Sequence, residues 1–301
     1  MNNTEFESYI KAGNIAKEVR EFSKYLVKPG TKLIKIALAI DDKIYELGGE
    51  PAFPVNLSMD EIAAHYTPEL NDETVANGIL KIDLGVSVNG FIADTSFSVD
   101  LTVDERYKKM NELNTKILDE VKKIIRPKMK IFEVGEKVQE ILEKYNGMNG
   151  TTFSAIKSLS GHELGENVIH AGLTISNYRN KNETELDEIA FAIEPFLTTG
   201  AGDVYEGKPG GIYALNSNLQ ARDSESRKIL NFIKENYKTR PFCLRWLEKN
   251  GFYKIKFMIS NLVKQGILHQ YPLLIEKTKS PVSQFEHTFV IHNGKAICTT
   301  D

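Results

Sequence analysis

The sequence predicts a chain that combines amphipathic helices with antiparallel β-strands, and three observations indicate this mixture. Two helical patterns of apolar residues open the chain. A β-hairpin signal follows at Asn89-Gly90, a dipeptide that favours a two-residue turn. The region from Phe153 to Ile291 alternates strand-like segments with glycine-rich loops. With 301 residues, the chain could form one large domain or two ordinary ones, and either would bury a good core.

The composition excludes several classes of protein. The formal net charge of −3 gives no sign of a nucleic-acid-binding coat or an acidic tail. Two cysteines, Cys243 and Cys298, make neither a disulfide framework nor a thiolate zinc site, which is typical of a reducing compartment. The first residues lack a signal peptide, and no apolar run approaches the roughly 20 residues of a membrane span. These features predict a soluble cytoplasmic protein without membrane contact.

The two opening helices are predicted from the spacing of their apolar residues and from the residues that end them. The first is predicted over residues 4–26, where Ile15 and Val19 are among the apolar residues at helical spacing. Pro29-Gly30 ends this helix, and Thr31 begins a second one that Gly48-Gly49 closes. Short strand-like segments and loops follow before the hairpin.

The hairpin allows its register to be derived from sequence. Its strands, residues 79–88 and 91–101, flank the turn directly. A two-residue turn then places Gly85 opposite Asp94. Asp83 lies on the same face as Asp94, as a diagonal neighbour with Cα atoms about 7–8 Å apart.

We interpret this pair of aspartates as part of a cation site, and we expect Gly85, opposite Asp94, to leave room for the ion. The alternative is a pair of carboxylates on a solvent-exposed sheet face. Ser87 and Ser96 favour that alternative, because they are polar residues on the same face.

Further helices are predicted after the hairpin. Thr102 and Glu105 have the spacing of a capping box before a long charged helix that Pro127 stops. Another helix is predicted over residues 132–145. Three short helical patterns leading into a strand pair, over residues 224–274, look like a winged-helix insertion.

Ionisable residues interrupt apolar or glycine-rich stretches at five places. They are Asp83, Asp94, His162, Glu194 and Glu286. A charged side chain inside an apolar strand must be paired, hydrogen-bonded or bound to metal. Few cationic residues are near enough in sequence to neutralise four carboxylates, so this set predicts a catalytic site that holds a pair of cations. Carboxylates with one imidazole suit Mn, Fe, Co or Zn and argue against a structural thiolate zinc site.

The other histidines differ in their sequence context. His170 lies eight residues after His162, and both occupy glycine-flanked turns, which favours a functional role for the two. His65, taken alone, is interpreted as structural. His287 follows Glu286 on a predicted strand and therefore faces the opposite side of it, so it is not expected to be a ligand.

Several fragments of the chain together resemble methionine aminopeptidases. They are Ile82-Asp83-Leu84-Gly85 to Asp94, Gly161-His162 with Ile169-His170, Ala192-Ile193-Glu194-Pro195, Gln284-Phe285-Glu286-His287-Thr288 and Ala63-Ala64-His65-Tyr66-Thr67-Pro68. Their order and spacing cover nearly the whole chain. The helical insertion between Glu194 and Glu286 resembles the type 2 enzymes, and the start of the chain resembles their short archaeal form.

The resemblance implies a fold and a set of site residues. The implied fold is the α+β pita-bread fold of creatinases and aminopeptidases, with two similar halves. We expect one such domain over residues 1–301, with the winged-helix-like subdomain inserted at residues 220–276. By the same resemblance, the five ionisable residues above are the ligands of two divalent metal ions. His65 and His170 are implied to be catalytic and substrate-binding, and the methionine pocket is implied to contain Phe53, Ile169 and Tyr271.

The function implied is removal of N-terminal methionine, by attack of a metal-activated hydroxide on the first peptide bond, with small second residues preferred. Glu194 is implied to be the general base, while His170, supported by His65, would hydrogen-bond the substrate or the oxyanion. The expected partners are nascent polypeptide N-termini, with a transient ribosome contact left open, no sequence-specific nucleic acid and a monomeric state. The alternatives are a prolidase or creatinase-like hydrolase, and a homologue that has lost catalysis and binds a partner. The insertion is interpreted as a wall and steric gate of the active site.

Overall fold

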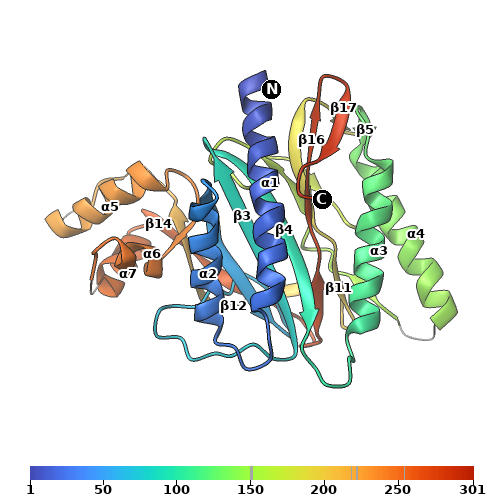
Figure 1. Ribbon diagram of the computed structural model, residues 1–301, viewed down its shortest axis with the longest axis horizontal. Helices are drawn as coiled ribbons and strands as arrows, with labels where there is room; N and C mark the ends of the chain where they lie inside the picture. Colours follow the sequence, from blue (N-terminus) through green and yellow to red (C-terminus); the bar gives the residue numbers. More distant parts are fainter. Residues whose placement is uncertain (150–151, 218, 222, 254) are drawn as a thin grey trace.

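The computed structural model describes residues 1–149, 152–217, 219–221, 223–253 and 255–301 (Figure 1). Its helices are α1 (Asn3–Leu26), α2 (Leu33–Glu46), α3 (Lys108–Ile124), α4 (Ile131–Asn149), α5 (Ser224–Asn236), α6 (Leu244–Lys249) and α7 (Lys256–Lys264). None of the helices in these described ranges is long and apolar enough to cross a membrane.

The strands form antiparallel sheets of two to five strands. The strands before α4 are β1 (Glu50–Met59), β2 (Ile62–Ala64), β3 (Ile79–Val88), β4 (Phe91–Asp100) and β5 (Met129–Lys130). Those between α4 and α5 are β6 (Ser154–Ala155), β7 (Gly161–Leu164), β8 (Thr174–Ile175), β9 (Glu185–Leu186), β10 (Ile189–Ile193), β11 (Phe196–Thr198) and β12 (Val204–Leu215). The remaining strands are β13 (Phe242–Cys243), β14 (Leu268–Glu276), β15 (Val282–Gln284), β16 (His287–His292) and β17 (Lys295–Cys298).

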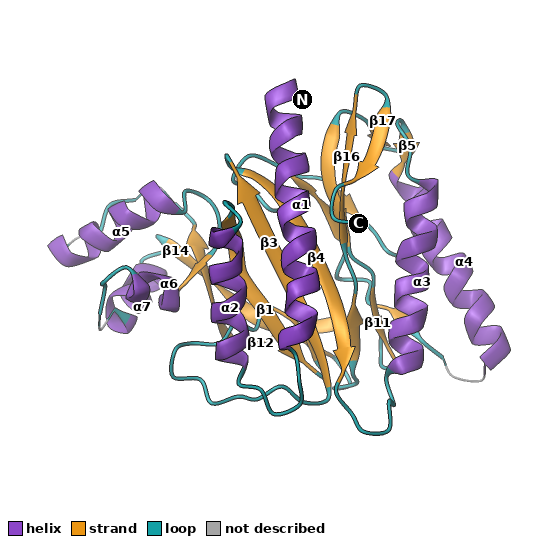
Figure 2. Ribbon diagram, viewed as in Figure 1, coloured by secondary structure: helices purple, strands orange, loops and turns teal. Residues whose placement is uncertain are grey.

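Each half of the molecule places two helices over an antiparallel sheet. Helices α1 and α2 lie in front of the sheet β1-β3-β4, and their apolar faces share one core with it (Figure 2). Helices α3 and α4 share a second core with β10 and β16, which belong to the sheet β17-β16-β10-β7-β8. This burial of apolar surface on both sides of the molecule provides the main driving force for folding.

The hairpin register derived from sequence is confirmed. Gly85 lies opposite Asp94 across β3 and β4, and the turn falls at Asn89-Gly90. The interpretation of Gly85 as room for an ion is wrong, however, because a Cβ atom at this position would lie 2.3 Å from Cε1 of Phe53. Glycine is needed here so that the aromatic ring of Phe53 can lie against the strand.

The predicted capping box is also wrong. Helix α3 begins at Lys108, several residues after Thr102, and Glu105 has a left-handed φ of 49°. The reason is that Asp100 organises the loop instead. Its carboxylate accepts hydrogen bonds from the hydroxyl of Thr102 at 2.6 Å and from the backbone N–H of Tyr107 at 2.7 Å. The helix therefore starts after this turn and not within it.

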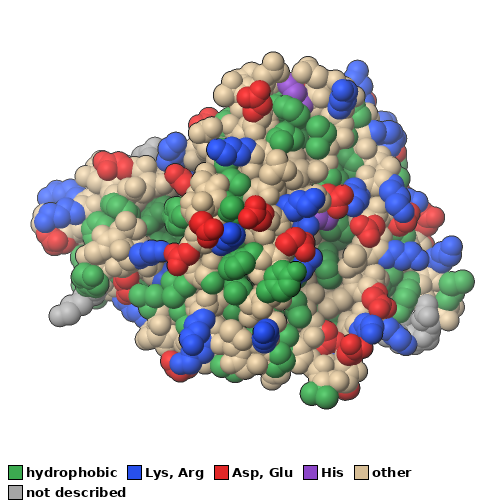
Figure 3. All heavy atoms as spheres, in the orientation of Figure 1, with side chains coloured by type: hydrophobic (Ala, Val, Ile, Leu, Met, Phe, Trp, Pro, Cys, Tyr) green, Lys and Arg blue, Asp and Glu red, His purple; other side chains and the backbone are tan. Residues whose placement is uncertain are grey.

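Helices α5, α6 and α7 extend to one side of the molecule, apart from the other four helices (Figure 1). They share a core of their own with β13 and part of β14. Arg245 on α6 anchors this helical group to α2, because its Nε atom lies 3.1 Å from Oδ2 of Asp41 and both side chains are buried. On the face of the molecule in Figure 3, acidic and basic side chains are interspersed.

Candidate metal centre and active site

The five ionisable residues selected from the sequence line a single cavity of about 400 Å³. Asp83 is on β3, Asp94 on β4 and His162 on β7, while Glu194 directly follows β10 and Glu286 lies between β15 and β16. Both halves of the molecule therefore contribute to the site. Asp94, only 3% exposed, is not part of a solvent-exposed face, so the exposed-face alternative for the hairpin is excluded.

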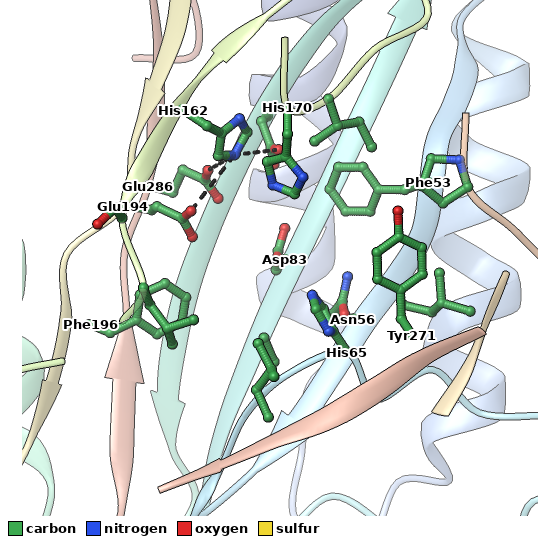
Figure 4. Close-up of a pocket in the computed structure, with 18 of the residues that line it drawn as sticks. Phe53, Asn56, His65, Asp83, His162, His170, Glu194, Phe196, Tyr271 and Glu286 are labelled. Atoms are coloured by element: carbon green, nitrogen blue, oxygen red, sulfur yellow. Dashed lines mark ion pairs between the residues drawn. The ribbon is translucent and has the colours of Figure 1, made fainter. Parts of the chain in front are cut away.

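His162 is the centre of this cluster. Its Nε2 atom lies 3.9 Å from Oδ2 of Asp94, 3.7 Å from Oε1 of Glu194 and 4.0 Å from Oε1 of Glu286. These three contacts are the dashed lines in Figure 4. Asp94, His162 and Glu286 each offer a ligand atom, and the three atoms lie within 4.8 Å of one another. One cation could therefore contact all three side chains.

The carboxylates of the cluster lack enough partners of their own. In the part of the chain that the structure describes, Oδ1 of Asp83, Oδ1 of Asp94 and both carboxylate oxygens of Glu286 are buried without a hydrogen-bond donor. A buried carboxylate without a partner carries a large desolvation cost. These orphaned oxygens fit a divalent cation, which takes hard oxygen ligands together with imidazole.

The electrostatics of the cluster lead to the same conclusion. Burial raises the pKa of Asp83 to about 7. Burial, followed by repulsion from neighbouring carboxylates, raises the pKa values of Asp94 and Glu286 well above the ordinary range. Burial lowers the pKa of His162 to about 3, which keeps its ring neutral, as a metal ligand must be. A bound cation would favour the ionised carboxylates.

Two residues that hold the cluster in place were missed by sequence reasoning. The side-chain amide of Gln284 donates to Oδ2 of Asp83 and to Oε2 of Glu194, each at 3.3 Å. The hydroxyl of Thr288 accepts from the backbone N–H of Asp94 at 2.7 Å and donates to the Asp94 carbonyl at 2.8 Å. The spacing of these residues could have revealed them. Gln284 and Thr288 each lie two positions from Glu286, so on an extended segment all three side chains point to one side.

Local sequence explains the placement of Glu194 and His162. Pro195 disfavours a helical backbone at Glu194, and the side chain of Asn177 donates to the Glu194 carbonyl at 2.9 Å. Gly161 permits β7 to approach β10 closely, since a Cβ atom there would lie 2.3 Å from the carbonyl oxygen of Ala192.

His65 and His170 line the same cavity. The rings of His162 and His170 pack edge to face with centroids 4.4 Å apart. His65 has a left-handed φ of 71°, and its Nδ1 atom lies 3.0 Å from the carbonyl oxygen of Pro272. Because that oxygen can only accept, Nδ1 carries the proton and Nε2 is an acceptor. Burial lowers the pKa of His65 to about 4, so the ring stays neutral.

One side of the cavity is apolar. Phe53 and Tyr271 lie across from Glu194 and Glu286 in Figure 4, with Asp83 between the two groups. Ile169 also lines the cavity, so all three residues selected for the methionine pocket are together. Thr239 and Pro241, between α5 and β13, also line the cavity.

The profile of metallopeptidase family M24 matches residues 7–292 of the chain. The chain belongs to metallopeptidase family M24. The M24 relatives include a methionine aminopeptidase of Methanocaldococcus jannaschii, 40% identical over 98% of this chain and 98% of its own. Methionine aminopeptidase 2 of Lodderomyces elongisporus is 34% identical over 97% of this chain and 65% of its own length. The archaeal relative is aligned over nearly its whole length, whereas the yeast relative extends well beyond the part that aligns with this chain.

The crystal structure of a methionine aminopeptidase from Rickettsia prowazekii has the same fold. Its TM-score is 0.68 at 21% identity, with 100% of this chain and 98% of that chain covered. The pita-bread fold expected from the sequence is confirmed. As a member of M24, the chain is a hydrolase, and its buried cluster of aspartate, glutamate and histidine is suited to bind divalent metal.

Metal should stabilise the folded M24 chain, because only the folded state brings the five side chains together. At a free Mn²⁺ concentration one hundred times the dissociation constant, we expect the free energy of unfolding to rise by about 2.7 kcal/mol. Urea denaturation with Mn²⁺ and with chelator measures the difference. Glu206→Gln, which changes an exposed glutamate, should retain the effect, while Glu286→Gln should reduce it. An equal effect in both variants would place the bound metal elsewhere.

Proposed function

We propose that this M24 hydrolase removes the N-terminal methionine from nascent proteins and peptides. The observation that carries the proposal is the joining of two features in one cavity. A buried carboxylate and imidazole cluster lies on one side, and an apolar wall that includes Phe53 and Tyr271 lies on the other. Ile169 lines the same cavity and packs against the apolar cluster that contains Phe53. The archaeal and yeast relatives named methionine aminopeptidase support it.

Asp83, Asp94, His162, Glu194 and Glu286 are proposed to hold two divalent ions, with Mn, Fe, Co and Zn all suited to the donors. Bound there, such ions supply Lewis acidity and lower the pKa of a water molecule toward neutrality. The four carboxylates and one imidazole offer enough donors for two ions to share them, as the orphaned oxygens of three carboxylates suggest.

Glu194 is proposed to move the proton in the reaction. One of its oxygens is held by the Gln284 amide, which orients the carboxylate within the cluster. Glu194 accepts a proton from the attacking water and delivers it to the nitrogen that leaves when the first peptide bond breaks. His170, at the mouth of the cavity, donates to the substrate carbonyl as negative charge develops on it. His65, whose Nε2 is an acceptor, receives a hydrogen bond from a substrate N–H.

The apolar wall is proposed to select the first side chain. Methionine is unbranched and flexible, so it fills an irregular apolar space between aromatic rings. Thr239 and Pro241 line the cavity, which supports the role of residues 220–276 as an inserted subdomain that limits access. A preference for small second residues belongs to the same proposal.

The test is steady-state hydrolysis of Met-Ala-Ser, compared with Pro-Ala-Ser and Ala-Met-Ser, by chelator-treated protein supplied with each metal in turn. We expect metal-dependent release of methionine from the first peptide alone. Cleavage of the other peptides would favour a different exopeptidase specificity. Tight binding of two metal ions without turnover would favour the non-catalytic, partner-binding alternative.

The cellular setting stays a prediction. The proposed substrates are nascent N-termini, so we place the enzyme in the cytoplasm, where polypeptides emerge during synthesis. A monomeric state is a separate prediction. Among the described residues, both Cys243 and Cys298 are free thiols, in agreement with a reducing compartment.

A further inference from the structure

A second cavity, of about 360 Å³, lies beside the one that holds the cluster. The two cavities share four lining residues, Ser158, Ser160, His162 and His170. Because these residues belong to both linings, the second cavity directly adjoins the cavity that contains the carboxylate cluster.

The lining of this second cavity differs from that of the first. Ser158 and Ser160 lie on one segment of it, and Thr174, Ser176 and Tyr178 lie on another. The Ser158 hydroxyl already accepts a hydrogen bond from the backbone N–H of Val204 at 3.3 Å. Hydroxyl groups both donate and accept hydrogen bonds, so the others can pair with the N–H and the carbonyl groups of a peptide backbone. The apolar side chains that line the first cavity in number are nearly absent from this described lining, where Leu173 is the apolar member.

Lys157 gives the second cavity its charge. It is exposed, and in the described chain it forms no ion pair. Its backbone N–H donates to the carbonyl of Gly202 at 3.0 Å, which fixes the segment beside the cavity. Asp203, the carboxylate beside Ser158, is already paired with Lys277. No aspartate or glutamate is among the described residues of the lining.

We propose that this cavity, which we call the hydroxyl groove (Ser158, Ser160, Thr174, Ser176, Tyr178 and Lys157), binds the part of the substrate that follows the second residue. The inference rests on the proposed function. The hydroxyls bind the extended backbone with little regard to sequence, as an enzyme that acts on many N-termini requires. Lys157 favours an acidic side chain at the third to fifth position over a basic one.

The experiment compares Met-Ala-Ser-Glu-Gly, Met-Ala-Ser-Gln-Gly and Met-Ala-Ser-Lys-Gly as substrates of the Mn²⁺-loaded full chain. An exposed charge pair gives a small, salt-sensitive preference, so kcat/KM should fall about threefold at each step from Glu to Gln to Lys, mainly through KM. The differences should collapse at 1 M NaCl, where the Debye length is about 3 Å.

Lys157→Glu should reverse the order of the three peptides. Lys11→Glu changes the net charge equally on an exposed position of α1 that lines neither cavity, and should leave the order as in the wild type. If all three peptides are cleaved equally, or if Lys157→Glu keeps the wild-type order, the hydroxyl groove assignment is overturned while the aminopeptidase function stands. Absence of methionine release from every peptide overturns the proposed function and this inference with it.

Discussion

Glu194→Gln should lower kcat for methionine release by about 10²–10⁴-fold, the range that a positioned general base contributes. The amide keeps the size of the side chain but cannot accept the proton of the attacking water. KM should change little, because the apolar wall and His170 that bind the substrate are untouched. Steady-state hydrolysis of Met-Ala-Ser at saturating Mn²⁺ measures both constants.

The same variant should fold at least as well as the wild type without metal. Burial is the main cause of the raised pKa values of Asp94 and Glu286, and repulsion from neighbouring carboxylates, Glu194 among them, adds to it. A neutral amide at position 194 removes part of that repulsion. The main-chain contacts of residue 194, to the Asn177 side chain, are unaffected by the substitution. Urea denaturation in chelator checks this expectation, and metal analysis of the loaded protein checks that two ions remain.

Glu206→Gln, at an exposed position, provides the matched control and should keep wild-type kcat. A Glu194→Gln enzyme that retains its metal and keeps kcat within tenfold of the wild type would assign the proton transfer to another group. A loss of metal together with activity would instead limit Glu194 to the role of ligand.

The site was predictable because ionisable residues are conspicuous in apolar strands. Asp83 in Ile-Asp-Leu-Gly and Glu194 in Ala-Ile-Glu-Pro stand out against their neighbours, since burying such a group requires a partner. The hairpin register followed from one turn, and it brought Asp83 and Asp94 to one face. The residues that hold these acidic side chains in place were not selected, because neutral polar side chains such as Gln284 and Thr288 are common in strands whether or not they bind anything.

One error in the fold came from a contact between distant segments, and the other came from a competing hydrogen bond within the same loop. Gly85 was expected to leave space for an ion, and only the packing of β1 against β3 reveals that Phe53 fills that space. The capping signal at Thr102 was sound as a local pattern, but Asp100 captures the same loop with its carboxylate. A local sequence pattern indicates a preference, and competing side-chain hydrogen bonds or tertiary packing decide whether that preference is realised.

Arg245→Met should destabilise the fold by about 3–5 kcal/mol, because it leaves the buried carboxylate of Asp41 without its cation. Nε of Arg245 lies 3.1 Å from Oδ2 of Asp41, and the guanidinium also donates to the hydroxyl of Thr67 at 2.6 Å. Trp246 donates to the same Asp41 oxygen at 2.8 Å, but one neutral donor does not neutralise a buried charge. Urea denaturation of the metal-free chain measures the loss.

A second ion pair between α2 and α6 serves as the control. Nζ of Lys249 lies 2.6 Å from Oδ1 of Asp42, but the two side chains are 54% and 64% exposed. Lys249→Met should therefore cost less than about 1 kcal/mol, the range for surface pairs. The contrast tests burial directly, since both variants remove a cation that joins the same two helices.

The double variant Asp41→Met/Arg245→Met distinguishes an unpaired charge from lost packing. If the cost of Arg245→Met comes mainly from the unpaired carboxylate of Asp41, removing that carboxylate should restore much of the stability. The restoration should be incomplete, because Trp246 then has no acceptor and Thr67 has no donor. A double variant as unstable as the single one would mean that the shape and hydrogen bonds of Arg245 hold the insertion in place. If Arg245→Met lowered the free energy of unfolding no more than Lys249→Met does, the burial argument would be contradicted. Removing one partner of a buried ion pair must cost more than removing one partner of an exposed pair.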